Sequence, residues 1–353
     1  MKEYIISKDL TLRSALKIMD KVSDKILFVQ ENNQLVGSLS DGDIRRALLN
    51  NMELSILVNQ VMNKTPFFIT ESFNINEVKK ILLEQEYQAI PVLNENKVIV
   101  EILFWHKVFK KKSKSYKQLD IPVVLMAGGK GTRLAPFTDI LPKPLIPIKN
   151  KPVIEIIIDE YKKYGIEKVF ISVNFKSRMI KAYFEDSEKY KDLNFIEEDK
   201  PLGTAGALKY LESTLEKTFF VSNCDIIIKE DYSKIYDFHK NGDFDLTMIG
   251  SVQHHTIPYG VCKMGKDGRL LEIEEKPEYD IIVNTGMYIL EPSTLKLIPE
   301  NELFHITQLI DILIKKNPNS VGVYPVSEKS WIDVGQWEEY RKSIKQFNDL
   351  GNP

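Results

Sequence analysis

The apolar residues in the C-terminal two thirds of the chain alternate between continuous runs and helical spacing. Residues 121–126 and 168–174 are short apolar runs, which predict buried strands. Residues 153–164, between them, have the spacing of an amphipathic helix. A further helix over 179–184 and a further strand over 193–197 continue the series. Strands that alternate with helices predict an α/β fold with a doubly wound, mostly parallel sheet.

The N-terminal third contains an internal repeat with an offset of 63 residues. Residues 12–19 match residues 75–82, and both segments have apolar side chains at helical spacing. Residues 25–36 match residues 88–99, each predicting a strand, an Asn-rich turn and a second strand. A helix–strand–turn–strand–helix unit that is repeated once predicts two copies that pack on each other.

A chain of 353 residues is too long for one ordinary core, so we expect two domains. We place them at residues 1–110 and 120–353, joined by a lysine-rich linker over 111–119 that includes Ser113 and Ser115. The net charge of −2 argues against a nucleic-acid partner. No apolar run reaches the roughly 18 residues of a membrane span, and the N-terminus lacks the apolar core of a signal peptide. We therefore expect a cytoplasmic protein without a membrane partner.

Cysteine and histidine usage gives no indication of a metal centre. The chain has two cysteines, Cys224 and Cys262, and their spacing suits neither a zinc site nor a disulfide framework. His254 and His255 are adjacent but lack an evident third ligand. We expect this pair in a loop at the rim of a substrate site, after a strand over 245–252.

A glycine-rich turn follows the first predicted strand of the larger domain. Gly128, Gly129 and Gly131 let the backbone approach a ligand closely. Lys130 and Arg133 lie in the same turn, and Lys143 follows between two prolines that stiffen the chain. Backbone N–H groups with three nearby cations suit a polyphosphate. A turn with solvated basic residues is the alternative on local grounds, and the pattern is neither a Walker A nor a Rossmann motif.

The full string G-G-K-G-T-R-L, followed by L-P-K-P-L, resembles the signature of the sugar-phosphate nucleotidyltransferases. The resemblance extends from about residue 121 to residue 337. It implies a nucleotidyltransferase fold similar to the GT-A class and a Mg²⁺-dependent transfer of a nucleotidyl group from an NTP to a sugar 1-phosphate. It assigns a catalytic role to four cations: Lys130, Arg133, Lys143 and Lys276.

The same resemblance implies the remaining site residues. Asp225 lies where a buried strand over 219–228 is broken, and an Asx turn is the local alternative; the family makes it a Mg²⁺ ligand with Asp333. The residues implied for nucleotide binding are Leu125, Ala127, Gly128, Gly129, Gly131, Thr132, Glu198, Pro201, Gly203, Thr204 and Asn223. Those implied for the sugar phosphate are Tyr259, Gly260, Glu275, Lys276, Asn284 and Thr285.

Glu198 bears on the choice of base. In the uridylyl and thymidylyl enzymes of the family this position is often glutamine. Uracil and thymine present one N–H between two carbonyls, and the glutamine amide can accept from the N–H and donate to a carbonyl. A carboxylate only accepts hydrogen bonds, and guanine presents N1–H and N2–H₂ as adjacent donors. Glu198 therefore favours GTP, although a glutamate that points to solvent is the alternative.

The repeated N-terminal segment resembles a tandem pair of CBS modules, also called a Bateman module. In the first copy, Ser40 and Asp43 occupy the turn where such modules hold an adenine nucleotide, and they could equally cap a helix. In the second copy the equivalent positions are Leu103 and His106, and Leu103 cannot bond a ribose. At most one nucleotide site is expected, and dimer formation or docking is an alternative role.

The combination of a CBS pair with this enzyme domain resembles the glucosamine-1-phosphate guanylyltransferases of bacterial legionaminic acid synthesis. It implies an NDP-sugar as product, for surface glycan or nonulosonic acid synthesis, and a homodimer or higher homo-oligomer. The alternatives within the enzyme class are mannose- or heptose-1-phosphate guanylyl transfer, uridylyl or thymidylyl transfer, and choline-phosphate cytidylyl transfer. A catalytically silent nucleotide sensor is the alternative outside it, and the six intact charged residues argue against that reading.

Overall fold

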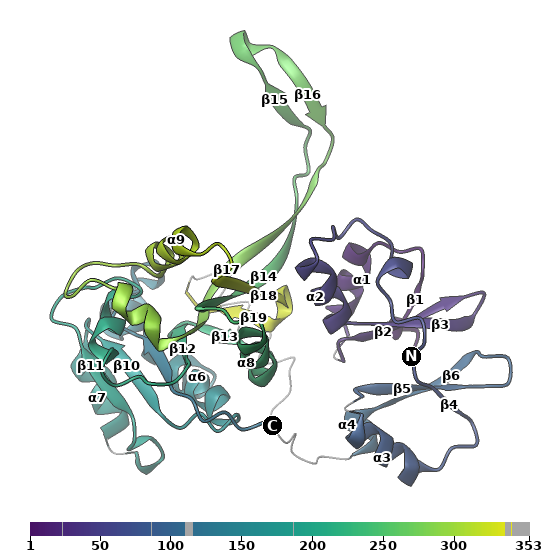
Figure 1. Cartoon of the computed structure of the whole chain (residues 1–353), viewed down its shortest axis with the longest axis horizontal. Coiled ribbons are helices and arrows are strands. Elements are labelled where there is room, and N and C mark those ends of the chain that lie inside the picture. Colours follow the sequence, from purple (N-terminus) through teal and green to yellow (C-terminus); the bar gives the residue numbers. More distant parts are fainter. Residues whose placement is uncertain (23, 86, 110–115, 186, 336–339, 341–353) are drawn as a thin grey trace. The chain divides into compact units, whose positions relative to one another are not determined.

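The computed structural model describes residues 1–22, 24–85, 87–109, 116–185, 187–335 and 340. The chain divides into two compact units, Met1–Ser115 and Tyr116–Pro353 (Figure 1). Most of the predicted linker, including Ser113 and Ser115, lies outside the described residues.

The first unit consists of two copies of one small α/β arrangement. Its elements are η1 (Lys2–Tyr4), β1 (Ile5–Ser7), α1 (Leu12–Met19), β2 (Ile26–Glu31), β3 (Gln34–Ser40), α2 (Asp41–Leu49), η2 (Val58–Gln60), β4 (Ile69–Thr70), α3 (Ile75–Glu84), β5 (Ala89–Leu93), β6 (Ile99–Phe104) and α4 (Trp105–Val108). The sheets β1-β2-β3 and β4-β5-β6 each join one parallel and one antiparallel pair. The identical topology confirms the repeat.

The two copies share a core. Phe28 of the first copy lies in one buried cluster with Ala89, Ile102 and Phe104 of the second. The Leu35 amide of the first also donates to the Lys97 carbonyl of the second at 3.0 Å. The predicted packing of one copy on the other is therefore confirmed.

The second unit is built on a seven-stranded sheet in the order β11-β10-β7-β12-β17-β14-β18. These strands are β7 (Val123–Met126), β10 (Val169–Val173), β11 (Asn194–Glu197), β12 (Phe219–Asn223), β14 (Leu246–Thr256), β17 (Glu278–Leu290) and β18 (Val321–Ser327). The pairs made by β17 are antiparallel and the other four are parallel. The predicted α/β class with a mostly parallel sheet is confirmed.

Three short strand pairs accompany this sheet: β8 (Pro147–Ile148) with β9 (Lys151–Pro152), β13 (Ile226–Ile228) with β19 (Trp331–Asp333), and β15 (Val261–Met264) with β16 (Leu270–Glu274). The α-helices are α5 (Phe137–Ile140), α6 (Val153–Lys162), α7 (Ser177–Glu185), α8 (Tyr232–Asn241) and α9 (Ile306–Lys316). The 3₁₀ turns are η3 (Thr132–Leu134), η4 (Lys143–Leu145), η5 (Glu188–Tyr190), η6 (Gly206–Leu211), η7 (Lys266–Gly268), η8 (Pro292–Leu297) and η9 (Glu328–Ser330).

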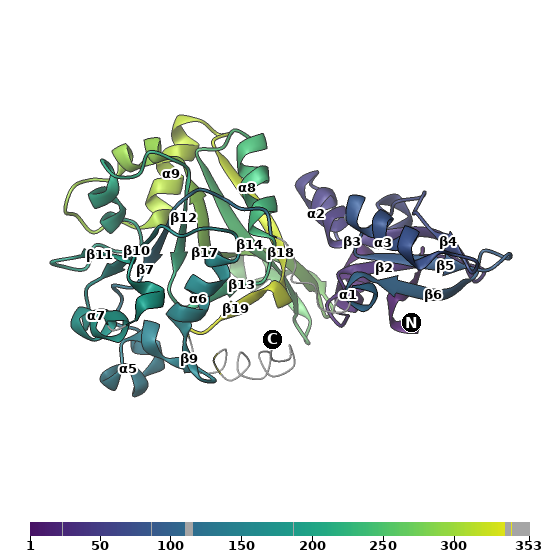
Figure 2. The same ribbon diagram turned by 90° about the horizontal axis from the view of Figure 1, so that it is seen from below.

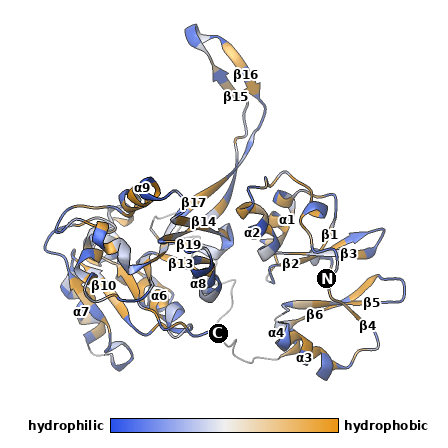
Figure 3. Ribbon diagram, in the orientation of Figure 1, coloured by the Kyte–Doolittle hydropathy of each residue, from blue (hydrophilic) through white to orange (hydrophobic). Residues whose placement is uncertain are grey.

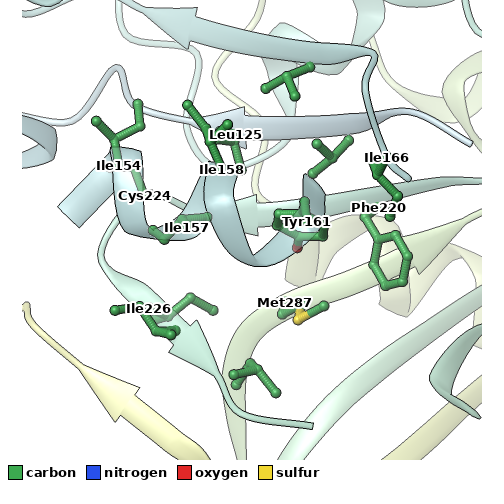
Figure 4. Packing of buried hydrophobic residues seen from close by; sticks show 14 of the residues in the cluster. Leu125, Ile154, Ile157, Ile158, Tyr161, Ile166, Phe220, Cys224, Ile226 and Met287 are labelled. Atoms are coloured by element: carbon green, nitrogen blue, oxygen red, sulfur yellow. The ribbon is translucent and has the colours of Figure 1, made fainter. Parts of the chain in front are cut away.

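Helices cover both faces of the seven-stranded sheet. Buried side chains of α6, α7 and α8 pack on one face, and those of α9 pack on the other (Figure 2). Helix α6 packs through Ile154, Ile157, Ile158 and Tyr161, whose spacing of three to four residues places them on one side of the helix. Figure 4 shows these side chains in one cluster with Leu125, Cys224 and Phe220.

Two features of the sequence take on a structural meaning here. Burial raises the pKa of the Cys224 thiol to about 12, so this cysteine serves packing and not reactivity. His254 and His255 lie within β14, paired with Asp280 and Tyr279 of β17. The prediction of a loop at the two histidines is therefore wrong, because the partner strand extends the ladder beyond the apolar run. Among the described residues, no helix is long and apolar enough to cross a membrane.

Candidate functional site

The glycine-rich turn leaves the carboxyl end of β7, in the middle of the sheet between β10 and β12. Gly131 has φ = +65°, and an added Cβ there would lie 2.9 Å from the Lys143 side chain. The Thr138 hydroxyl donates to the Gly131 carbonyl at 3.0 Å and fixes the end of the turn. The turn is therefore folded back on the segment that carries Lys143.

Lys143 opens η4 and forms a salt bridge with Asp225, which follows β12. The two side chains are only 11% and 13% exposed. Water screens such a pair poorly, so each charge depends on the other for compensation. The salt bridge joins the region after β7 to the region after β12.

Asp333 is brought to the same place by the pairing of β13 with β19, in which Ile226 lies opposite Asp333. The Gly335 amide donates to Asp333 Oδ1 at 2.6 Å. An added Cβ at Gly335 would lie 2.7 Å from Asp225 Oδ2, 2.8 Å from Asp333 Oδ1 and 3.1 Å from Lys143 Nζ. The two carboxylates and the ammonium group thus converge on the backbone of one glycine.

Burial and a neighbouring like charge act together on Asp333 in this cluster. Burial, followed by the nearby charge of Asp225, raises the pKa of Asp333. Lys143 and Arg133 act in the opposite direction but do not cancel the shift. A cation between the two carboxylates would relieve both effects, and two hard oxygens with room for water and phosphate suit Mg²⁺. Within the described part of the chain, no cluster of three or more His, Cys, Asp and Glu offers a fuller set of ligands.

Glu198 is buried against the glycine-rich turn. One carboxylate oxygen accepts from the Ser172 hydroxyl, and the other accepts from the Leu202 amide at 3.0 Å. An added Cβ at Gly128 would lie 2.6 Å from Glu198 Oε1, so the absence of a side chain at Gly128 makes room for this carboxylate. Each oxygen has a second lone pair beyond these bonds.

The loop after Glu198 uses its small residues for packing. Gly203 has φ = +81°, and an added Cβ there would lie 2.6 Å from the Phe304 carbonyl oxygen. An added Cβ at Gly206 would lie 2.8 Å from the Glu302 carbonyl oxygen, and Thr204 accepts from the Ile306 amide at 3.0 Å. The space that these glycines leave is therefore occupied by the segment before α9.

Asn284 and Thr285 lie where β17 is irregular. The Thr285 hydroxyl is buried and donates to the Ile249 carbonyl at 2.7 Å. Asn284 Oδ1 accepts from the Gly286 amide at 2.9 Å, and its Nδ2 donates to the Tyr288 hydroxyl at 2.7 Å. Both side chains shape the strand, and Asn284 remains exposed at its surface.

The other predicted sugar-phosphate residues are on a projecting hairpin. Tyr259 is 75% exposed, and Lys276 is exposed with φ = +48°. Gly260 lies close to Glu275, since an added Cβ would be 3.1 Å from Glu275 Oε2. The structure thus divides the predicted site residues into one group on the sheet and one group on the hairpin.

The remaining predicted residues of the nucleotide side line the turn and its surroundings. Leu125 and Ala127 are buried, Gly128 and Asn223 are half-buried, and the exposed ones are Gly129, Lys130, Thr132, Arg133 and Pro201. Sequence reasoning missed Ser172 and Gly335. Gly335 lies only two residues after Asp333, and this position could have indicated its part in the site. The reason why it must be glycine appears only in the structure, where the side chains of Lys143, Asp225 and Asp333 meet at its backbone.

In the first unit, Ser40 and Asp43 form a capping box at the start of α2, with the Ser40 amide donating to Asp43 at 2.7 Å. A cavity of about 480 Å³ in this unit is lined by residues of both repeats, among them Ser38, Thr65 and Tyr87. Neither Ser40 nor Asp43 lines it. These hydrogen bonds confirm that the two residues cap α2, and a nucleotide site at them stays a prediction.

Comparison with known proteins gives two family matches. Residues 122–349 match the family described as nucleotidyl transferase, and residues 1–50 and 58–110 match the CBS domain. The cluster of Lys143, Asp225 and Asp333 at Gly335 falls wholly within residues 122–349.

Among curated relatives, the chain is 30% identical to the D-glycero-α-D-manno-heptose 1-phosphate guanylyltransferase of Aneurinibacillus thermoaerophilus, over 64% of this chain and 97% of that protein. It is 32% identical to the mannose-1-phosphate guanyltransferase of Candida albicans and 28% identical to the UTP–glucose-1-phosphate uridylyltransferase of Synechocystis. The matches cover 62% and 63% of this chain, and in both cases 62% of the relative.

Two solved structures are similar to the larger unit. HddC from Yersinia pseudotuberculosis has a TM-score of 0.50 at 27% identity, over 64% of this chain and 99% of that one. A putative glucose-1-phosphate thymidylyltransferase from Bacillus anthracis has a TM-score of 0.52 at 20% identity, over 66% and 97%. The second similarity supports the fold alone.

Proposed function

Since this chain belongs to the nucleotidyl transferase family, we propose that it transfers a nucleotidyl group from an NTP to a sugar 1-phosphate and releases pyrophosphate. The observation that carries the proposal is the convergence of Lys143, Asp225 and Asp333 on Gly335, beside the glycine-rich turn. Such a cluster can hold a divalent cation and a phosphate group against each other.

The proposed reaction needs no covalent intermediate with the protein. An oxygen of the sugar phosphate attacks the α-phosphorus, the bond between the α-phosphorus and the β-phosphate oxygen breaks, and pyrophosphate leaves on the opposite side. Phosphoryl-type transfer depends mainly on positioning and on stabilisation of charge. Lys130 and Arg133, exposed on the turn, hold the leaving phosphates, and Lys143 stabilises charge at the α-phosphate. Lys276 holds the sugar phosphate.

A divalent cation, most simply Mg²⁺, would be held by Asp225 and Asp333. When bound, it would neutralise negative charge on the phosphate oxygens. Lys143 contributes to the same neutralisation, because its salt bridge with Asp225 holds its ammonium group beside the cation ligands. The convergence of the two carboxylates on Gly335 supports this assignment, and burial, followed by the charge of Asp225, raises the pKa of Asp333.

We propose GTP as the nucleotide. Glu198 lies against Gly128 of the phosphate turn, and each of its oxygens has a lone pair that could accept from N1–H or N2–H₂ of guanine. The guanylyl relatives from Aneurinibacillus and Candida support the same choice. For the sugar phosphate we retain glucosamine 1-phosphate as the first candidate, with the mannose and heptose 1-phosphates next.

A substrate matrix tests the proposal. GTP, UTP, dTTP and CTP would each be combined with glucosamine, mannose, glucose and heptose 1-phosphates, and with choline phosphate, while pyrophosphate release is followed. We expect release from GTP with one sugar phosphate, its loss with EDTA, and its return when Mg²⁺ is added in excess. A folded protein that releases no pyrophosphate in any combination would contradict the proposal.

A further inference from the structure

The hairpin over residues 256–278, here called the arm, exposes several large apolar side chains of the second unit. It contains β15 and β16 and projects beyond the seven-stranded sheet as a narrow ribbon (Figure 1). The β14–β17 ladder continues into it without interruption from Gly250 opposite Asn284 to Thr256 opposite Glu278. The Ile257 amide then donates to the Pro277 carbonyl at 3.0 Å, so the base of the arm is held in line with the sheet.

The two faces of the arm differ in polarity. Lys263 lies opposite Glu272 on one face, where the two side chains form an exposed salt bridge at 3.8 Å. Strand alternation places Ile273, which pairs with Cys262 and is 59% exposed, and Met264 on the other face, and Leu271 lies at the bulge beside them. Leu271 is 65% exposed and Met264 is 72% exposed. Figure 3 shows the hydrophobic colouring of β16 at this projecting end.

An arm of this kind requires a partner surface. A two-stranded ribbon is marginally stable in water, and one with an uncovered apolar face exposes surface that usually marks an interaction site. The nine residues from Thr256 to Met264 reach up to about 30 Å at 3.3 Å per residue. A domain of the size of the second unit has a radius of gyration of roughly 18 Å, so a ribbon of this length reaches well across the surface of a second such domain.

The chemistry of the arm identifies the partner. The arm carries Tyr259, Glu275 and Lys276, which the proposed function assigns to the sugar phosphate. The groups that they must meet, Lys143 and the two aspartates, are on the sheet. A surface with the matching half of the site is presented by another copy of this chain.

We propose that the arm of one copy docks on the catalytic sheet of a second copy, so that two chains build each sugar-phosphate site. The proposal rests on the proposed function. The apolar face covers the second copy near its site, and the face with Lys263 and Glu272 stays in water. The exchange is reciprocal, because a two-fold dimer uses the same contact twice.

Mixing two impaired variants tests the exchange, with the sugar phosphate kept below its KM. Asp225→Asn disables the sheet half of the site, and Lys276→Ala weakens the arm half by roughly 10- to 100-fold under these conditions. In a mixed dimer, one site combines both lesions and the other combines two intact halves. After subunits are allowed to equilibrate at equal amounts, random pairing gives about a quarter of the wild-type rate of pyrophosphate release. A mixture of Asp225→Asn with Asp333→Asn, both on the sheet, is the matched control and should recover nothing.

The outcome is decisive once differently tagged copies are shown to co-purify. No recovery in a mixture that contains mixed dimers would mean that each arm serves its own chain, and this overturns the proposal. Activity of a wild-type protein that sedimentation shows to be monomeric would overturn it as well.

A second variant separates this proposal from the proposed function. Met264→Arg with Ile273→Arg places charge on the apolar face and should convert the dimer to monomer and reduce turnover by at least about tenfold. Lys263→Ala, on the opposite face, should change neither property. If the wild type proves inactive with every substrate, dissociation by the arginine variant would still support docking of the arm on a second copy. An arginine variant that remains dimeric would contradict it, whatever the activity.

Discussion

The two groups of predicted site residues differ in how firmly the chain holds them. Lys143, Asp225 and Asp333 are largely buried, bonded to one another or to the backbone, and supported by three segments that meet at Gly335. Tyr259 and Lys276 are exposed on a two-stranded arm. The sheet group is therefore pre-organised for charge stabilisation, whereas the arm group needs a further surface before it can act.

This difference indicates a division of labour. The groups that stabilise developing charge lie where water is excluded, because electrostatic interactions are strongest there. The groups that recognise the sugar lie on a segment whose position depends on docking. We expect substitutions in the sheet group to reduce turnover and substitutions in the arm group to weaken use of the sugar phosphate.

The largest effect is expected at Asp225. Asp225→Asn retains an oxygen that can accept from Lys143 but removes one of the two carboxylate charges, so turnover should fall by at least about 10²-fold with the fold intact. Pyrophosphate release and thermal unfolding would be measured together. Asp231→Asn is the control, because Asp231 caps α8 through the Ser233 amide at 3.0 Å. Near-wild-type turnover in Asp225→Asn would remove the metal assignment.

A smaller effect is expected at Lys276 of the arm. Lys276→Ala removes a charge-assisted contact with the sugar phosphate, worth about 1.5–3 kcal/mol or roughly 10- to 100-fold in kcat/KM. The loss should appear mainly in KM for the sugar phosphate, while KM for the NTP stays the same. Lys263→Ala serves as the control on the same arm. A rise in KM for the NTP alone would show that Lys276 contacts the nucleotide and not the sugar phosphate.

At Glu198 we expect a change of selectivity and not of rate alone. Glu198→Gln can still accept from the Leu202 amide and donate to the Ser172 oxygen, so the buried contacts survive. One acceptor for guanine is lost, and the preference for GTP over UTP should fall by about tenfold in kcat/KM. Unchanged ratios would leave the guanylyl proposal without its chemical support, whereas the nucleotidyl transfer itself would stand.

A stability measurement extends the comparison to the opposite end of the sheet. Burial opposes ionisation of Glu291, but hydrogen bonds from His239, Lys240 and Thr218 outweigh it and lower the pKa of Glu291 to about 2. A lowered carboxyl pKa stabilises the fold above the ordinary value of 4.5, and this stabilisation is lost as pH falls towards 2.

Glu291→Gln should therefore reduce the free energy of unfolding by about 2 kcal/mol at pH 7, and the difference from wild type should shrink between pH 4.5 and pH 2. Denaturant unfolding at several pH values would measure it. Glu272→Gln on the arm should cost nothing measurable, because its salt bridge with Lys263 is exposed. A difference for Glu291→Gln that does not depend on pH would contradict the assignment.

The smallest effect is expected from removal of the first unit. A protein that begins at Tyr116, where the second unit starts, contains both groups of the site and should retain activity within about threefold. Turnover per site and oligomeric state would be compared with the full chain. Insoluble or inactive protein would show that the CBS pair belongs to the catalytic unit.

The sequence by itself determined the α/β class, the repeat and the positions of the strands that end in the glycine-rich turn and at Asp225. These features follow from local apolar periodicity and from glycine chemistry, which a single segment expresses without its neighbours. Only the tertiary structure decided that Asp333 and Lys143 meet Asp225 at Gly335, that the glycines after Glu198 pack against the segment before α9, and that His254 lies in a strand. It also decided that the sugar-phosphate residues divide between the sheet and an arm. Each of these outcomes depends on which distant backbone segment lies alongside, and strand pairing across about 20 to 110 residues leaves no trace in the local pattern.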